Sequence, residues 1–197
     1  MQKFSTTRLA GVLAIGALAI ACSPKAEDGT DTLATTPPAT ATTPTTDMGW
    51  TDANVIDVIT VANQGEVDYS QLGVDKATNA SVKEFAQMMV KDHGTMLTAV
   101  KDLAARLNVT PASNDKANEL KEDVNKEIGE LNAKTVGKDF DNEFMEEQVE
   151  LHQKTLDLLN DLDGRTTNAD LKAAIAEAKP KVQAHLDRAK AVKDLVD

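Results

Sequence analysis

The stretch EFAQMMVKDHGTMLTAVKDL, residues 84–103, decides the fold of this chain. Its apolar residues recur with a period near 3.6, which predicts an amphipathic helix, and His93 lies among them on the apolar side. A second stretch, EFMEEQVELHQKTLDLLNDL at residues 143–162, has the same residue at seven of twenty positions. The pattern EFxxxxVxxHxxxL therefore occurs twice, 59 residues apart, which suggests a duplicated helical hairpin, although shared amphipathic spacing supplies part of the match.

The same helical period extends over the chain from residue 51 onward, and no segment alternates as a β-strand would. We therefore predict an all-α fold in which four long amphipathic helices pack as a bundle. A further segment, residues 113–134, is strongly charged and has only a thin apolar edge, so we place it outside the bundle or crossing over it. The four long helices are predicted at residues 53–76, 81–107, 138–163 and 168–197.

Several local signals add detail to these helices. The tetrapeptide SVKE at residues 81–84 matches a capping box, so we expect the second helix to begin there. Pro180 lies inside the last helix, where it removes a backbone hydrogen bond and should bend the helix. Gly65 and Gly94 also lie inside predicted helices, where glycine costs about 1 kcal/mol relative to alanine. We expect either close helix packing or a small pocket to need the space that they leave.

The N-terminus has the pattern of an export signal. Lys3 and Arg8 precede the apolar run LAGVLAIGALAIA, which is too short to span a bilayer as a stable helix. The run ends in AIAC at residues 19–22, which resembles the lipobox of bacterial lipoproteins, where the cysteine is lipidated and becomes the first mature residue. We expect a signal peptide over residues 1–22 and a lipid on Cys22, with ordinary secretion as the alternative.

Residues 23–50 are dominated by Thr, Pro, Ala and acidic side chains. Such a composition cannot bury enough apolar surface to fold, so we expect a disordered linker that tethers a helical bundle domain of residues 51–197. If Cys22 is lipidated, the serine that follows it fits export to the outer membrane of a two-membrane bacterium. We therefore expect an envelope protein that is anchored in the outer membrane and faces the periplasm.

Charge and cysteine content limit the partners and chemistry of the chain. Without residues 1–22 the chain has 19 basic and 32 acidic residues, a net charge of −13. Such a surface repels phosphates, so we expect no nucleic-acid binding, and we expect membrane contact through the lipid anchor. Cys22 is the only cysteine, which excludes disulfides and cysteine clusters in the mature protein. No patterned nucleophile, phosphate loop or cofactor motif occurs, so we predict that the protein is not an enzyme.

Four segments carry a family resemblance: EFAQMMVKDH, VELHQKTLDL, KPKVQAHLDRA and, in the first helix, ANQGEVDYSQLGVDKA. They resemble the motifs of the bacterial domain-of-unknown-function family 4142, and the similarity covers residues 51–193. The resemblance implies a ferritin-like four-helix bundle with one accessory helix in an exported protein, and loosely a role in envelope stress tolerance. It implies a fold and a location rather than an activity.

Four residues each lie on the apolar stripe of a different long helix: Glu66, His93, His152 and His185. Imidazole and carboxylate suit zinc, copper, iron or manganese, so one hypothesis is a metal site that holds a divalent or copper ion. The other hypothesis is that the rings are buried, neutral and hydrogen-bonded, with Glu66 paired to His93 as the simplest case. We favour a non-enzymatic binding or structural role, with metal binding as the alternative.

A ferritin-like oxidoreductase is a second alternative for these residues. Ferritin-like carboxylate sites use Glu-x-x-His on two helices. In this chain a valine stands three residues before each histidine, at Val90, Val149 and Val182. Such a redox centre would therefore lack its bridging ligands.

Helix geometry predicts how closely the four residues can approach. Glu66 and His93 are each about 11 or 12 residues from the turn between their helices, so they lie at nearly the same height. His152 lies about 11 residues before the predicted end of its helix and His185 about 17 after the predicted start of the next. At 1.5 Å per residue this is an offset of about 9 Å for straight antiparallel helices, so we expect no compact site of all four residues.

Overall fold

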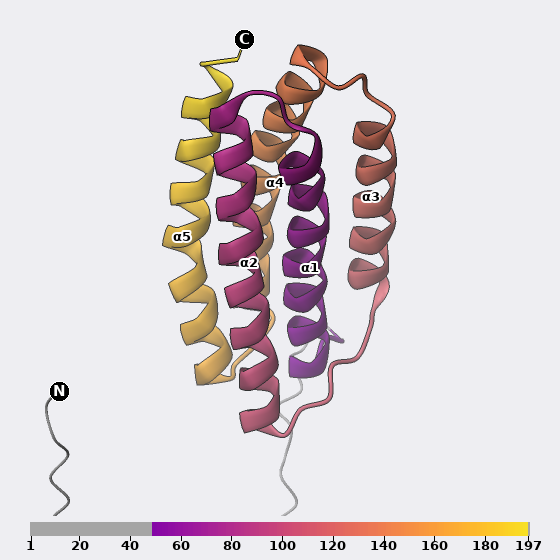
Figure 1. Ribbon diagram of the computed structural model, residues 1–197. Helices are drawn as coiled ribbons and strands as arrows, with labels where there is room; N and C mark the ends of the chain where they lie inside the picture. The colour runs from indigo at the N-terminus through magenta and orange to yellow at the C-terminus, as the bar shows by residue number, and fades with distance from the viewer. Residues whose placement is uncertain (1–48, 197) are drawn as a thin grey trace, which may run out of the picture. The chain divides into compact units, whose positions relative to one another are not determined.

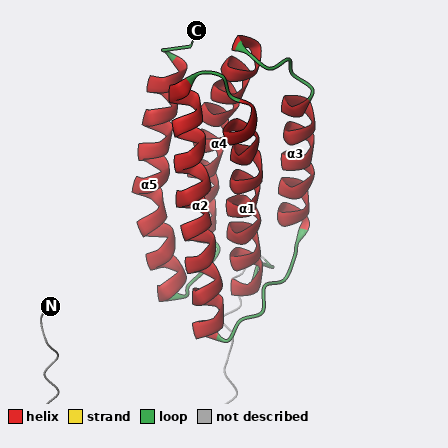
Figure 2. Ribbon diagram, viewed as in Figure 1, coloured by secondary structure: helices red, strands yellow, loops and turns green. Residues whose placement is uncertain are grey.

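The computed structural model describes residues 49–196, and α-helices account for most of this range. No strand occurs within the described residues, which confirms the predicted all-α fold (Figure 2). Within the same range, no helix combines the length and the apolar character needed to cross a bilayer. The predicted signal peptide, Cys22 and nearly all of the linker lie outside the described residues. The helices are α1 (Asp52–Lys76), α2 (Ala80–Leu107), α3 (Asp115–Asn132), α4 (Lys138–Gly164) and α5 (Ala169–Lys193).

Four of these helices, α1, α2, α4 and α5, form the bundle, and α3 packs against the outer side of α1 (Figure 1). Around the bundle the order is α1, α2, α5 and α4, and each helix runs antiparallel to its two neighbours. The diagonal pair α2 and α4 therefore runs in one direction, so the chain must return along the bundle between them, and α3 is that return. A single long crossover is the connectivity of ferritin-like bundles. The predicted outer position of the charged segment is confirmed.

The loop between α1 and α2 corrects the predicted start of the second helix. The N-cap of α2 is Asn79, whose side chain accepts hydrogen bonds from two backbone N–H groups of the first turn. The predicted capping box at residues 81–84 is therefore wrong. Asp141 of α4 holds the loop just before α2 in place. Its carboxylate accepts from the Thr78 hydroxyl at 2.6 Å and from the Asn79 backbone N–H at 2.8 Å.

The other helix ends agree with their sequence signals. Asn168 caps α5, which runs without interruption through the exposed Pro180. α2 ends at Leu107, before Pro111, because Asn108 takes the left-handed conformation that terminates many helices, with φ of 52°.

Two apolar clusters fill the bundle, one on each side of a buried polar layer. The first comes from the N-terminal halves of α1 and α5 and the C-terminal halves of α2 and α4. The second comes from the opposite halves and includes the stacked rings of Tyr69 and Phe144, with centroids 5.6 Å apart. Burial of these side chains stabilises the fold on both sides of the layer. The polar layer consists of Glu66, His93, Gln148, His152 and His185.

Two helical glycines mark close contacts between helices. A Cβ on Gly73 would lie 2.6 Å from the ring of Phe144, and a Cβ on Gly65 would lie 2.7 Å from Val124 of α3. Close packing, one of the two predicted reasons for Gly65, is therefore confirmed. Gly94 differs, because a Cβ there would meet no atom within 4 Å.

Alanine at Gly73 and at Gly94 should therefore change stability in opposite directions. Gly94→Ala gains helix propensity without a steric conflict and should raise the free energy of unfolding by up to about 1 kcal/mol. Gly73→Ala displaces the ring of Phe144 and should lower the free energy by about 1–3 kcal/mol. Urea unfolding followed by circular dichroism measures both effects, and a more stable Gly73→Ala protein would contradict the close contact.

Candidate metal centre

Three histidines from three helices meet in the polar layer. His93 of α2, His152 of α4 and His185 of α5 are 2%, 0% and 6% exposed. The ring centroids are 5.7 Å apart for His93 and His152, 5.3 Å for His93 and His185, and 5.5 Å for His152 and His185. One nitrogen can be chosen from each ring so that all three lie within 4.8 Å of one another. The three rings thus form a nearly equilateral triangle.

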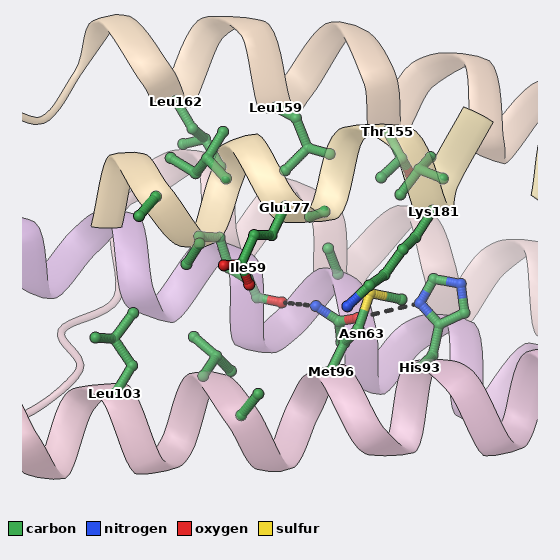
Figure 3. A pocket seen from close by; sticks show the side chains of 18 of the residues that line it. Ile59, Asn63, His93, Met96, Leu103, Thr155, Leu159, Leu162, Glu177 and Lys181 are labelled. Atoms are coloured by element: carbon green, nitrogen blue, oxygen red, sulfur yellow. Dashed lines mark hydrogen bonds between the residues drawn. The ribbon is translucent and has the colours of Figure 1, made fainter. Parts of the chain in front are cut away.

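A hydrogen-bond acceptor holds one nitrogen of each ring, which we call the outer nitrogen. Carbonyl and carboxylate oxygens only accept, so each outer nitrogen carries the proton of the neutral ring. Asn63 is oriented for this role because its Nδ2 donates to the backbone carbonyl of Ile59 at 2.8 Å, which leaves its Oδ1 for the ring (Figure 3). The outer nitrogens donate as follows: Nδ1 of His93 to Oδ1 of Asn63 at 3.1 Å, Nδ1 of His152 to the backbone carbonyl of Gln148 at 2.8 Å, and Nε2 of His185 to Oδ2 of Asp92 at 3.2 Å.

The remaining nitrogen of each ring, the inner nitrogen, is buried and has no hydrogen-bond partner. These atoms are Nε2 of His93, Nε2 of His152 and Nδ1 of His185. Because the outer nitrogens carry the protons, each inner nitrogen presents a lone pair. A buried acceptor without a donor costs about 1–3 kcal/mol. Three such lone pairs on adjacent rings are a ligand set that a transition-metal cation can satisfy.

Burial keeps at least two of the rings neutral at neutral pH. It lowers the pKa of His93 from 6.5 to about 3, with a further contribution from His152 and His185 and an opposing one from Asp92. The pKa of His185 is also lowered, first by burial and then by His152, against the hydrogen bond to Asp92. Neutral imidazole is the form that binds a metal ion.

Glu66 of α1 lies beside the triangle of rings, near an outer nitrogen rather than the inner ones. Its Oε2 accepts from Nε2 of Gln148 at 3.2 Å, and its Oε1 lies 3.9 Å from Nδ1 of His152. The expected pair of Glu66 and His93 is wrong, because the ring of His93 donates to Asn63, one turn earlier on α1. Glu66 and His93 do line one cavity, in agreement with their predicted common height.

The predicted separation of His152 and His185 is also wrong, since their ring centroids are 5.5 Å apart. Helical side chains lean toward the N-terminus of their own helix. In the antiparallel pair α4 and α5, the ring of His152 therefore leans away from the connecting loop and the ring of His185 leans toward it. Both displacements reduce the gap that follows from the backbone rise alone, and the observed helix bounds, Gly164 and Ala169, reduce it further.

The sequence did not identify the groups that hold the outer nitrogens. Gln148 acts through its backbone carbonyl, which any residue would supply. Asn63 could have been found, because it lies one turn before Glu66 on the same face of α1. Asp92 of α2 contacts His185 of α5, and the periodicity of a single helix does not reveal such a contact.

The fold and the site together define an all-α protein with one crossover helix and a buried layer of three histidines. The family model described as DUF4142, a domain of unknown function, matches residues 34–192, and the chain belongs to this family. The resemblance of its motifs to that family is thereby confirmed. No curated protein and no solved structure matches the chain.

The lowered pKa values predict that acid destabilises the metal-free protein. Above pH 6.5 the ring of His93 is neutral in both the folded and the unfolded chain. Below that pH the unfolded chain binds a proton at His93 that the folded chain excludes down to about pH 3. The free energy of unfolding therefore decreases as the pH is lowered. The slope is about 1.4 kcal/mol per pH unit for one such histidine, and His185 acts in the same direction.

A His93→Gln variant tests this pH dependence. It lacks one of the rings that resist protonation, so between pH 6 and pH 5 it should lose about 1 kcal/mol less stability than the wild type. Urea unfolding with a chelator present measures the difference. The groups that face His93 are His152, His185 and Asp92, and they are kept in the variant. Parallel pH profiles would contradict the prediction.

Proposed function

We propose that the protein binds one divalent transition-metal ion through the inner nitrogens of His93, His152 and His185. The supporting observation is that each ring has one nitrogen held by an acceptor and one buried nitrogen without a donor. Metal-ligating histidines have this arrangement, because the outer hydrogen bond fixes the tautomer and the orientation of the ring. Zinc–nitrogen distances of about 2.0–2.1 Å place ligand nitrogens about 3.4 Å apart. One nitrogen of each ring, Nδ1 or Nε2, already lies within 4.8 Å of one nitrogen of each of the other two rings, which is close to that spacing.

The all-nitrogen ligand set selects the class of ion. Imidazole suits zinc, copper, nickel and iron, whereas magnesium and calcium prefer oxygen ligands. Zinc is our first candidate, because three histidines with an open fourth position are a known zinc arrangement, and copper(II) has the higher intrinsic affinity for such ligands. We assign Glu66 a supporting role, since its carboxylate lies 3.9 Å from the outer nitrogen of His152 and places negative charge behind that ligand.

One ion fits this layer better than a dinuclear redox centre does. Dinuclear centres in ferritin-like bundles use glutamates one turn before their histidines. Valine occupies those positions here, and the cluster of candidate ligand atoms within the described residues contains histidine nitrogens only. We therefore propose a binding role without catalysis.

Metal analysis of the purified protein tests the proposal. After incubation with zinc or copper(II) and removal of free ion, we expect one ion per chain by elemental analysis. At free metal 100 times the dissociation constant, the ion should add about 2.7 kcal/mol to the free energy of unfolding. His152→Leu should abolish both effects. Met89→Leu is the matched control, because Met89 lies one turn before His93 on the same buried face of α2.

The metal-free form of His152→Leu separates the metal site from a purely structural polar core. His152 is 0% exposed and its inner nitrogen has no partner, so leucine removes an unsatisfied acceptor and leaves the carbonyl of Gln148 in its helical hydrogen bond. We expect the variant to be at least as stable as the wild type in chelator. A loss of several kcal/mol together with no stoichiometric metal would sink the proposal and support the structural role.

We further propose that the protein is an exported lipoprotein of the cell envelope, anchored through Cys22 and facing the periplasm from the outer membrane. The support comes from the sequence alone: the basic and apolar N-terminal segment, the AIAC motif, and the Thr- and Pro-rich residues that follow. A lipid at Cys22 would attach the bundle to the membrane through residues 23–50.

Cys22→Ser tests the anchor. The wild-type chain should incorporate a labelled fatty acid and sediment with the outer membrane, whereas Cys22→Ser should lose the label and move to the soluble periplasmic fraction or remain uncleaved. Ser23→Ala is the neighbouring control and should keep the label. A labelled Cys22→Ser protein, or an unlabelled wild type, would contradict lipidation at this residue.

A further inference from the structure

A cavity of about 490 Å³ lies between α1, α3 and α4, on the side of α1 that the crossover helix covers. Its volume falls within the range of small-molecule sites. Its wall includes exposed residues of α3 and α4, among them Glu119 and Lys154, so the cavity opens to solvent. Glu66 of the polar layer also lines it.

The charged groups of this cavity wall are mostly carboxylates. Six carboxylates line the cavity together with two ammonium groups, those of Lys116 and Lys154. Such an excess of negative charge attracts cations and repels anions. The six carboxylates belong to Glu66, Glu119, Asp123, Glu127, Asp157 and Asp161.

A buried hydroxyl in the same wall has no partner. Tyr69 is 2% exposed, and its hydroxyl makes no hydrogen bond within the described residues. The hydroxyl oxygen is not among the fully buried unpaired atoms, so it reaches the open space of the cavity that Tyr69 lines. Burial raises the pKa of Tyr69, and so do Glu147 and Glu127, which shows that carboxylates surround the hydroxyl. An oxygen in these surroundings can accept a hydrogen bond from a cationic N–H group.

Glu127 is the second group of the wall with an unsatisfied atom. Its Oε2 is buried and has no hydrogen-bond partner. The ammonium group of Lys154 lies 3.9 Å from its Oε1 but 2.7 Å from Glu150, outside the cavity wall. Burial and Glu147 raise the pKa of Glu127 to about 7, against the charge of Lys154. A cation in the cavity would supply the close positive charge that this carboxylate lacks.

The spread of the carboxylates favours an extended organic cation over a metal ion. Within residues 49–196, the side chains whose ligand atoms converge on one point are three histidines, and no carboxylate belongs to that group. Glu119 and Glu127 are about 12 Å apart along α3 at 1.5 Å per residue. Because α4 runs antiparallel to α3, Asp157 lies toward the Glu119 end of the cavity. Aliphatic side chains line the cavity as well, namely Leu120, Val124 and Leu158.

We propose that this cavity binds a linear aliphatic diamine, with one ammonium group at Glu66, Tyr69 and Glu127. This ammonium group donates to the Tyr69 hydroxyl and to carboxylate oxygens. The methylene chain lies along the aliphatic side chains, where it gains by leaving water. The second ammonium group lies at Asp157, which has no ion pair within the described part of the chain. The diamine site needs no metal ion, because none of the three histidines lines this cavity.

Titration of 1,8-diaminooctane into the metal-free full-length protein tests the proposal. Calorimetry at pH 8, above the pKa of Glu127, should show one site. Tyr69→Phe keeps the ring that stacks on Phe144 and loses the unpaired hydroxyl, so it should fold normally and weaken binding about threefold to tenfold. Glu127→Gln should weaken binding at least tenfold. Glu122→Gln is the matched control, because Glu122 is exposed on the same helix and outside the cavity wall.

Two analogues of the probe test the role of its charges. n-Octylamine has one ammonium group and should bind at least tenfold more weakly, and 1,8-octanediol has none and should show no binding. Equal affinity for the diamine and n-octylamine would overturn the second ammonium position. Equal affinity for 1,8-octanediol would overturn the cation site altogether.

The variants separate this cavity from the acidic surface as a whole. If Tyr69→Phe and Glu127→Gln bind the diamine as tightly as the wild type, or if Glu122→Gln weakens binding as much as Glu127→Gln, the site is not this cavity and the proposal fails. Because the titration uses metal-free protein, its outcome is independent of the metal analysis. A chain that takes up no zinc or copper can still bind the diamine, and a chain that takes up one ion can fail to bind it.

Discussion

Three histidine rings, each with a buried nitrogen that has no hydrogen-bond partner, meet where the two apolar halves of the bundle join, and the remainder of the structure holds them there. Each of these nitrogens is an acceptor without a donor, which destabilises the folded protein by about 1–3 kcal/mol. If the packing around the rings were loose, the rings would move apart or polar groups would move in to pair with these nitrogens. The aromatic cluster on one side and the aliphatic cluster on the other prevent this, because every bundle helix contributes to both. The packing therefore fixes the level and spacing of the rings.

Periodicity was sufficient to predict the helices, because each buries a stripe with its own apolar pattern. The thin edge of α3 likewise predicted its outer position, where Ala117 and Leu131 are its buried residues. The site was less accessible to sequence reasoning. The four polar residues on the stripes were identified, but their distances depend on the direction in which side chains lean in antiparallel helices. That effect reduces the distance between the rings of His152 and His185 and was missing from a calculation based on backbone rise.

The crossover helix connects the fold to the site through α1. Gly65 lets α3 approach α1 closely, and the next residue, Glu66, lies at the boundary of two hollows. One hollow is the cavity beside His93; the other lies between α1, α3 and α4 and has a volume of about 490 Å³. The walls of both hollows include exposed residues, Ala99 and Ala173 in the first and Glu119 and Lys154 in the second, so Glu66 lies between two hollows that each open to solvent.

The choice of histidine over glutamate at the centre of the layer has a consequence for folding. A ferritin-type set of buried carboxylates accumulates negative charge, and such a bundle is strained without its ions. Neutral imidazoles bury no net charge, and of the valines one turn before the histidines Val182 is 2% exposed, whereas Val90 and Val149 are half-buried. The bundle can therefore fold before any ion binds, unlike small domains whose folding free energy is supplied by the metal. Loss of the proposed ion would then leave a folded protein in which His93, His152 and His185 still lie together in the buried layer.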